Sequence, residues 1–195
     1  YTGGKLHIPT ISTKKSVSLI KEAKQKGLNI TCSVAITNLL LTDDVLESFD
    51  TNYKLLPPLR TNTDIKALLK GIKEGVIDAI TSDHNPIDIE HKKIEFDHAL
   101  YGSIGLESCF GGLNSLFSTE TTVKMLTGLK EEFSIEPIGI EENNNADITL
   151  FNPNGEWVFS EKHILSSSKN SALIKSKLKG NVYGIFANKK LVLNK

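Results

Sequence analysis

The feature that most constrains the fold is a unit of amphipathic helix, glycine and apolar strand that occurs twice in succession. The first unit covers residues 12–36 and turns at Gly27, and the second covers residues 64–80 and turns at Gly75. Glycine accommodates the positive φ that ends many helices, and a strand directly afterwards is typical of a parallel α/β sheet. Together with a strand-like segment over residues 5–11, these units predict an α/β fold with parallel strands.

Polar residues follow the last of these strands. The strand runs directly into Asp83 and His84, within the sequence Thr-Ser-Asp-His-Asn-Pro of residues 81–86. In α/β barrels the carboxyl ends of the strands are where chemistry takes place. A carboxylate at such an end can ligate a metal or act as a general base toward a metal-bound water. The alternative is that Asp83 only caps a turn, because Asp and Asn are ordinary turn residues.

Arg60 is a second candidate for a functional side chain. It follows a pair of prolines at residues 57–58, and a guanidinium on such a rigid loop can clamp a substrate carboxylate. The alternative is a structural arginine at the surface. His84, His91 and His98 recur every seven residues, but a proline interrupts the helical pattern between them, so we interpret this spacing as coincidence.

The sequence changes character near residue 146. Residues 113–129 have a helical pattern, whereas residues 131–145 are acidic and rich in asparagine, as in an exposed connection. Beyond them, short apolar runs alternate with turn sequences such as Asn-Pro-Asn-Gly, which is typical of β-structure. We therefore expect two parts, an α/β part over residues 1–145 and a β-rich carboxyl-terminal subdomain over residues 146–195.

Composition excludes several classes of protein. The 195 residues carry 23 Lys and Arg against 23 Asp and Glu, so the basic surface of a nucleic-acid binder is not expected. No apolar run reaches the roughly 18 residues that cross a bilayer, so no membrane partner is expected. Cys32 and Cys109 do not have zinc-binding spacing, and we interpret them as buried, reduced thiols of a cytoplasmic protein.

Several motifs follow one another along the chain in a fixed order. They are GGKLHIPTISTKKSV at residues 3–17, LLLTD at 39–43, FDTNYKLLPPLR at 49–60, residues 63–80, SDHNP at 82–86, GSIGLES at 102–108, ADITLFNP at 146–153 and residues 180–188. In these motifs and their order the chain resembles, over nearly its whole length, the dihydroorotases of the cyclic amidohydrolase group. The tail is similar to the small carboxyl-terminal β domain of the same group.

The resemblance implies the carboxyl-terminal portion of a (β/α)8 amidohydrolase barrel, with strands 5 to 8 in residues 1–145, followed by the small β subdomain. A full barrel needs about 250 residues, and the chain opens at Tyr1 on a strand, so we expect it to be part of a longer protein. In the family, zinc activates water and a strand-end aspartate takes its proton. Asp83 matches this catalytic residue and is also the candidate metal ligand, and Arg60 and His84 match substrate-binding positions.

The chain departs from the family at the metal ligands. Thr10 stands where the strand-5 pattern has a histidine ligand, and Thr37 and Asn38 stand where strand 6 ends in two histidines. Ile87 replaces a substrate-contacting histidine, and Leu56 replaces an asparagine. Hydroxyl and amide oxygens are poor zinc ligands beside imidazole, so these changes predict a degenerate metal site.

The sequence therefore supports a dihydroorotase-like protein of pyrimidine biosynthesis with little or no hydrolysis of its own. The family interconverts dihydroorotate and N-carbamoyl-aspartate, so the expected ligand is a small cyclic amide or a carbamoyl amino acid. One alternative is an active metal-dependent dihydroorotase that uses ligands from the first half of the barrel. Another is a different cyclic amidohydrolase, of allantoinase or hydantoinase type. Inert members of the group assemble with aspartate transcarbamoylase, so this partner and a homo-oligomer are also expected.

Overall fold

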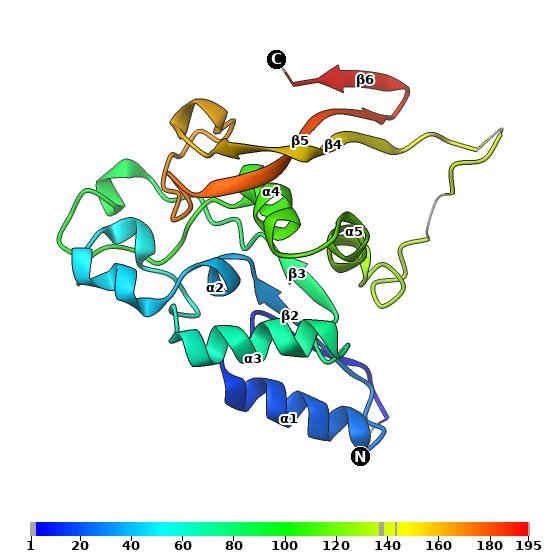
Figure 1. Ribbon diagram of the computed structural model, residues 1–195, viewed down its shortest axis with the longest axis horizontal. Coiled ribbons are helices and arrows are strands. Elements are labelled where there is room, and N and C mark those ends of the chain that lie inside the picture. Colours follow the sequence, from blue (N-terminus) through cyan, green and yellow to red (C-terminus); the bar gives the residue numbers. More distant parts are fainter. Residues whose placement is uncertain (1–2, 137–138, 143, 195) are drawn as a thin grey trace.

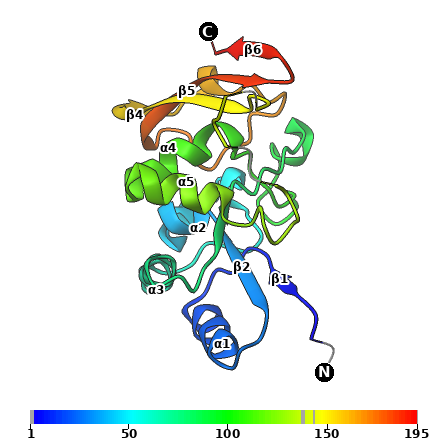
Figure 2. The same cartoon turned by 90° about the vertical axis from the view of Figure 1, so that its right-hand side faces the viewer.

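The computed structural model describes residues 3–136, 139–142 and 144–194. The chain forms two separate three-stranded sheets, one parallel and one antiparallel (Figure 1). Both views show helices α4 and α5 between these sheets, and Figure 1 shows helices α1 and α3 at the end of the molecule away from the antiparallel sheet (Figures 1 and 2). This layering is what the α/β pattern followed by a β-rich tail predicts.

The parallel sheet has the strand order β1, β2, β3, which confirms the predicted parallel α/β pattern. Leu6 is in register with Ile30, and Ser33 is in register with Ala79. A fourth parallel strand is not formed by the described residues, although His84 and Ser103 make a single parallel bridge beyond β3. The strands are β1 (Leu6–Ile8), β2 (Ile30–Ala35) and β3 (Ala79–Thr81).

The helices that follow β1 and β2 end where the sequence predicts. Gly27 and Gly75 have φ of 74° and 71°, values that a side chain would strain. The hydroxyl of Thr13 accepts a hydrogen bond from the backbone N–H of Ser16 and so caps the first helix. The helices are α1 (Lys14–Gln25), the short α2 (Thr37–Leu40) and α3 (Asn62–Lys73), and 3₁₀ turns lie at Asp43–Ser48, Thr51–Tyr53, Ile89–His91 and Glu161–His163.

The helical structure expected within residues 113–129 is present, but it does not form one helix. The structure has two helices there, α4 (Leu106–Leu116) and α5 (Thr119–Thr127), and the first begins well before the predicted start. Two glycines lie inside α4 because neighbours approach it closely: a Cβ on Gly111 would lie 3.0 Å from Leu178, and one on Gly112 would lie 2.9 Å from Leu40. Close packing therefore offsets the poor helix propensity of glycine.

After residue 146 the described residues form an antiparallel sheet of β4 (Ile148–Val158), β5 (Lys177–Ala187) and β6 (Lys190–Leu193). The two short strands expected around Asn-Pro-Asn-Gly are one long strand, whose register shifts between Asn152 and Glu156. Asn188 and Lys189 have φ of 51° and 62°, as a tight hairpin between β5 and β6 requires.

One hydrophobic core joins the two parts of the chain. Val34 of β2, Leu68 of α3 and Leu173 of the tail are fully buried in the same cluster. Cys32 and Cys109 are free and buried, which confirms the interpretation as buried thiols. None of the described helices has the length and apolar character needed to cross a bilayer.

Candidate functional site

Hydroxyl groups of β2 contact His7 of β1 and the turn that follows β1. The Ser33 hydroxyl lies 3.2 Å from Nε2 of His7 and 3.4 Å from the backbone nitrogen of Thr10, and Nδ1 of His7 lies 2.9 Å from the hydroxyl of Thr31. Thr10 has a φ of 47°, which is unusual for a β-branched residue. Thr10 thus lies in a tight turn just beyond β1, at the position where the sequence resemblance leads us to expect a ligand.

Thr37 and Asn38 lie directly after β2, at the start of α2. They are only 4% and 2% exposed. The side-chain amide of Asn38 donates a hydrogen bond of 3.1 Å to the carbonyl of Pro58. Asn38 therefore braces the proline-containing loop, and its amide group has a structural use.

Arg60 follows that loop and lies beside the first strand connection. Its Nε donates a hydrogen bond of 3.3 Å to the hydroxyl of Ser12, and its carbonyl accepts one of 3.1 Å from the backbone of Asp43. The ion pairs found among the described residues do not include Arg60. The guanidinium is thus held by a neutral hydroxyl and keeps its charge for an anion.

Asp83 lies two residues beyond β3, with a φ of 46°. The backbone N–H of Asp83 donates to the Thr81 hydroxyl over 3.1 Å, which fixes this left-handed turn. Burial raises the pKa of the Asp83 carboxyl above its usual value, since removal from water disfavours the charged form. A carboxylate with a raised pKa at a strand end is suited to proton transfer.

His84 has a structural partner that the sequence did not reveal. Its Nδ1 accepts hydrogen bonds from the backbone N–H of Gly105 and Leu106, over 3.2 and 3.3 Å, at the start of α4. An accepting Nδ1 leaves the proton of the neutral ring on Nε2. The imidazole therefore caps α4, and the predicted contact with substrate would have to use Nε2.

The candidate ligands do not match the ligand preferences of zinc. Zinc takes imidazole, thiolate and carboxylate ligands. At these strand ends Thr10 supplies a hydroxyl, the amide of Asn38 is already bonded to a carbonyl, and only Asp83 supplies a carboxylate. Across residues 3–136, 139–142 and 144–194, no group of three His, Cys, Asp or Glu side chains is placed to hold a metal ion. The described residues do not fit a zinc site by themselves.

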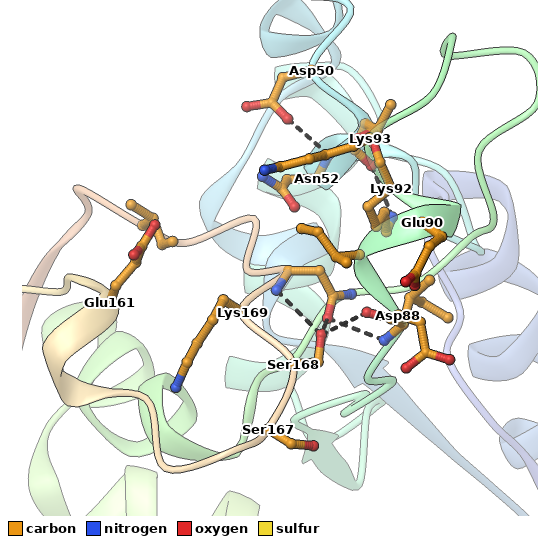
Figure 3. A pocket seen from close by; sticks show the side chains of 15 residues that line it. Asp50, Asn52, Asp88, Glu90, Lys92, Lys93, Glu161, Ser167, Ser168 and Lys169 are labelled. Atoms are coloured by element: carbon orange, nitrogen blue, oxygen red, sulfur yellow. Dashed lines mark hydrogen bonds between the residues drawn. The ribbon is translucent and has the colours of Figure 1, made fainter.

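A cavity of about 520 Å³ lies beside the loop that follows Asp83 (Figure 3). Three segments far apart in the sequence line it, residues 50–52, 87–93 and 161–174. Its wall carries lysine and acidic side chains together with Asn170, and the Nζ of Lys92 donates to the carbonyl of Thr51 over 2.8 Å. Sequence reasoning missed this cavity because no local motif records the meeting of the three segments.

Sequence comparison identifies the relatives of the chain. No family model matches it. The dihydroorotase of Thermoanaerobacter sp. (strain X514) is 43% identical over 188 residues, which are 93% of this chain and 43% of that protein. The chain is dihydroorotase-like. Other curated dihydroorotases match it at 35–40% identity. The dihydroorotase-like chain spans less than half the length of these relatives.

Solved structures bear out the fold of the dihydroorotase-like chain. An L-hydantoinase (dihydropyrimidinase) from Arthrobacter aurescens superposes with a TM-score of 0.89 at 22% identity, over 99% of this chain and 46% of that one. An inactive dihydroorotase-like domain of a CAD-like multifunctional protein from Chaetomium thermophilum gives 0.66 at 19% identity, over 96% and 50%. These similarities confirm the expected carboxyl-terminal portion of an amidohydrolase barrel.

Proposed function

We propose that the chain is part of a dihydroorotase-like protein of pyrimidine biosynthesis that has a degenerate metal site and little or no hydrolytic activity. The curated relatives named dihydroorotase support the family side of this proposal. The proposal of a degenerate metal site is supported by the residues at the strand ends, because a set of donors with few histidines binds zinc weakly.

The observation that carries the proposal is the hydrogen bond from Asn38 to Pro58. The amide is 2% exposed and donates over 3.1 Å to a carbonyl of the neighbouring loop, at one of the three positions where the family pattern has imidazoles. Thr10, at another such position, is held in a left-handed turn beside Ser33. Both residues serve the packing of the strand ends, so the fold persists without the ligands.

The same site keeps groups that could bind a ligand. Arg60 carries a charge without an ion-pair partner among the described residues, and Asp83 supplies a half-buried carboxyl. A cyclic amide or a carbamoyl amino acid presents the carboxylate and amide groups that these side chains bind. In this proposal, Arg60, Asp83 and Nε2 of His84 bind such a ligand without hydrolysing it.

Assembly would then be the main use of the protein. We include in the proposal a homo-oligomer, a complex with aspartate transcarbamoylase and a cytoplasmic location. The Chaetomium neighbour is described as an inactive domain of a multifunctional protein, which supports the idea that this fold persists without activity. The proposal also divides the chain into a barrel part over residues 1–145 and a β subdomain over residues 146–195.

A second candidate function is an active dihydroorotase whose metal ligands come from the first half of the barrel. Asp83 favours it, because this carboxyl keeps the strand-end position of the family base and its pKa is raised by burial. The allantoinase or hydantoinase alternative has no comparable support, since the hydantoinase structures share only 22% identity and establish the fold alone.

Turnover of dihydroorotate and N-carbamoyl-aspartate by the purified protein at its natural length distinguishes these candidates. We expect no saturable turnover above background in either direction. Saturable turnover that is abolished by Asp83→Ala and retained by Asp147→Ala, a change of an exposed acid in the tail, would establish the second candidate. Turnover of hydantoins alone would support the alternative substrate class.

A further inference from the structure

Asn170 is a buried side chain of the tail that reaches across to the Asp83 loop. It is 6% exposed, and every hydrogen-bonding group of its amide is used. Nδ2 donates to the carbonyls of Asn85 and Gly102, each over 3.2 Å, and Oδ1 accepts from the backbone N–H of Ile87 over 3.1 Å. One side chain from the tail thus joins two segments of the barrel part.

The backbone around Asn170 strengthens this junction. The carbonyl of Asn170 accepts from the backbone N–H of Ile104 over 2.9 Å. The Ser103 hydroxyl accepts from the backbone N–H of Ala172 over 2.9 Å, and the Ser103 carbonyl accepts from that of Asn85 over 2.8 Å. The tail segment and the two barrel segments therefore form one hydrogen-bond network, which is buried at Gly102, Ser103 and Asn170, where a lost partner is costly.

Both joined segments bear on the candidate site. Asn85 comes two residues after Asp83, and Gly105, just beyond Ile104, donates to the imidazole of His84. The two segments also touch closely, since a Cβ on Gly105 would lie 2.1 Å from the carbonyl oxygen of Ser82. A displacement of the Asn170 network would consequently displace the turn that carries Asp83 and the cap made by His84.

We propose that Asn170 is a positioning residue, through which the tail sets the conformation of the loop that carries Asp83 and His84. The inference rests on the proposed function only in taking this loop as the functional one. The tail is then more than a packed appendage of the barrel part. Asn170 also lies in the wall of the cavity drawn in Figure 3, beside Ser168, whose hydroxyl donates to the Ile87 carbonyl over 2.7 Å.

Two substitutions test the proposal in the protein at its natural length. Asn170→Ala removes the whole amide. Asn170→Asp keeps the size of the side chain and its acceptor, but removes the N–H donors that face the two carbonyls. Asn114→Ala is the matched control, because Asn114 is a 3% exposed asparagine whose Nδ2 donates to Pro153 and Lys179, away from the loop.

The measurements are amide hydrogen exchange of Ile87 and Ile104, and the ¹⁵N chemical shift of Nδ1 of His84 at one fixed pH. We expect roughly tenfold faster exchange at Ile87 in Asn170→Ala, which loses the acceptor of this N–H, and a changed Nδ1 shift of His84 in both Asn170 variants. The amide of Leu68 in α3 should keep its exchange rate, and Asn114→Ala should change neither loop signal.

Unchanged loop signals in the Asn170 variants would overturn the proposal, as would equal changes in Asn114→Ala. If Asn170→Ala does not fold, the isosteric Asn170→Asp is measured alone. Loss of the fold in both variants would also overturn it, because Asn170 would then serve general stability. None of these signals depends on metal or turnover, so the result is separate from the outcome for the proposed function.

Discussion

His84 and Gly105 are joined by a hydrogen bond of 3.2 Å in which the imidazole Nδ1 accepts from the backbone N–H at the start of helix α4. A second bond, from the N–H of Leu106, completes the cap. The first backbone N–H groups of a helix have no partner inside it, so a side-chain acceptor there stabilises the helix. The loop that carries Asp83 and His84 is consequently attached to the start of α4 by two hydrogen bonds.

Replacement of His84 by alanine should therefore lower stability. We expect His84→Ala to reduce the free energy of unfolding by about 1 kcal/mol, the usual size of a lost helix cap, as measured by urea denaturation. His98→Ala is the control, because His98 is exposed, and it should change this free energy by less than about 0.5 kcal/mol. Equal stability of His84→Ala and the wild type would show that the cap contributes nothing.

Lys92 should make stability depend on alkaline pH. Desolvation by burial lowers the pKa of its ammonium from 10.5 to about 8 in the folded protein. Between about pH 8 and 10.5 the unfolded chain keeps a proton that the folded protein has lost, so this group increases stability as the pH rises through that window. Below pH 8 Lys92 is protonated in both the folded and the unfolded state, so its contribution to stability does not change with pH there.

The test compares Lys92→Met with the wild type by urea denaturation from pH 7.5 to 10.5. The stability of the wild type relative to Lys92→Met should increase with pH, and the subtraction cancels the opposing ionisation of the cysteines, which both proteins share. Lys93→Met, at an exposed lysine, should leave the difference constant. A pH-independent difference for Lys92→Met would contradict the lowered pKa of Lys92.

The two cysteines should be unreactive while the protein is folded. Burial raises the pKa of Cys32 to about 11, with a further contribution from Asp78, and that of Cys109 to about 12. At pH 8 their thiolate fractions then fall about 100-fold or more below that of an ordinary thiol. Labelling with N-ethylmaleimide should be at least 100-fold slower in buffer than in 8 M urea. Fast labelling of either residue under native conditions would contradict this burial.

The common core should depend on Leu68. This side chain of α3 is fully buried, so Leu68→Ala should lower the free energy of unfolding by 2–5 kcal/mol, through lost burial and the cavity left behind. Leu19→Ala, at a leucine that is 52% exposed, should change it by less than about 0.5 kcal/mol. Similar losses for the two variants in urea denaturation would be inconsistent with the described core.

Local patterns were enough to predict much of this fold. The turns at Gly27 and Gly75, the parallel strands and the position of Asp83 beyond β3 follow from periodicity and from backbone chemistry at single residues. The antiparallel tail follows in the same way from its turn sequences. These features depend on neighbours along the chain, which the sequence displays directly.

The remaining features depend on contacts between distant segments. The cap by His84 requires Gly105, 21 residues later, and the junction at Asn170 requires Asn85, 85 residues earlier. Helix α4 begins ahead of its glycines because β5 and α2 approach it closely, although glycine disfavours helices locally. The sequence pattern alone does not show when tertiary contacts of this kind outweigh the local preference of glycine against helix.

The most direct test of the degenerate metal site is the zinc content of the protein at its natural length after equilibrium dialysis. The account predicts well under one zinc per chain in the wild type, and a gain when Thr10 and Asn38 are both replaced by histidine. One or more tightly held zinc ions per wild-type chain, lost in Asp83→Ala, would contradict it.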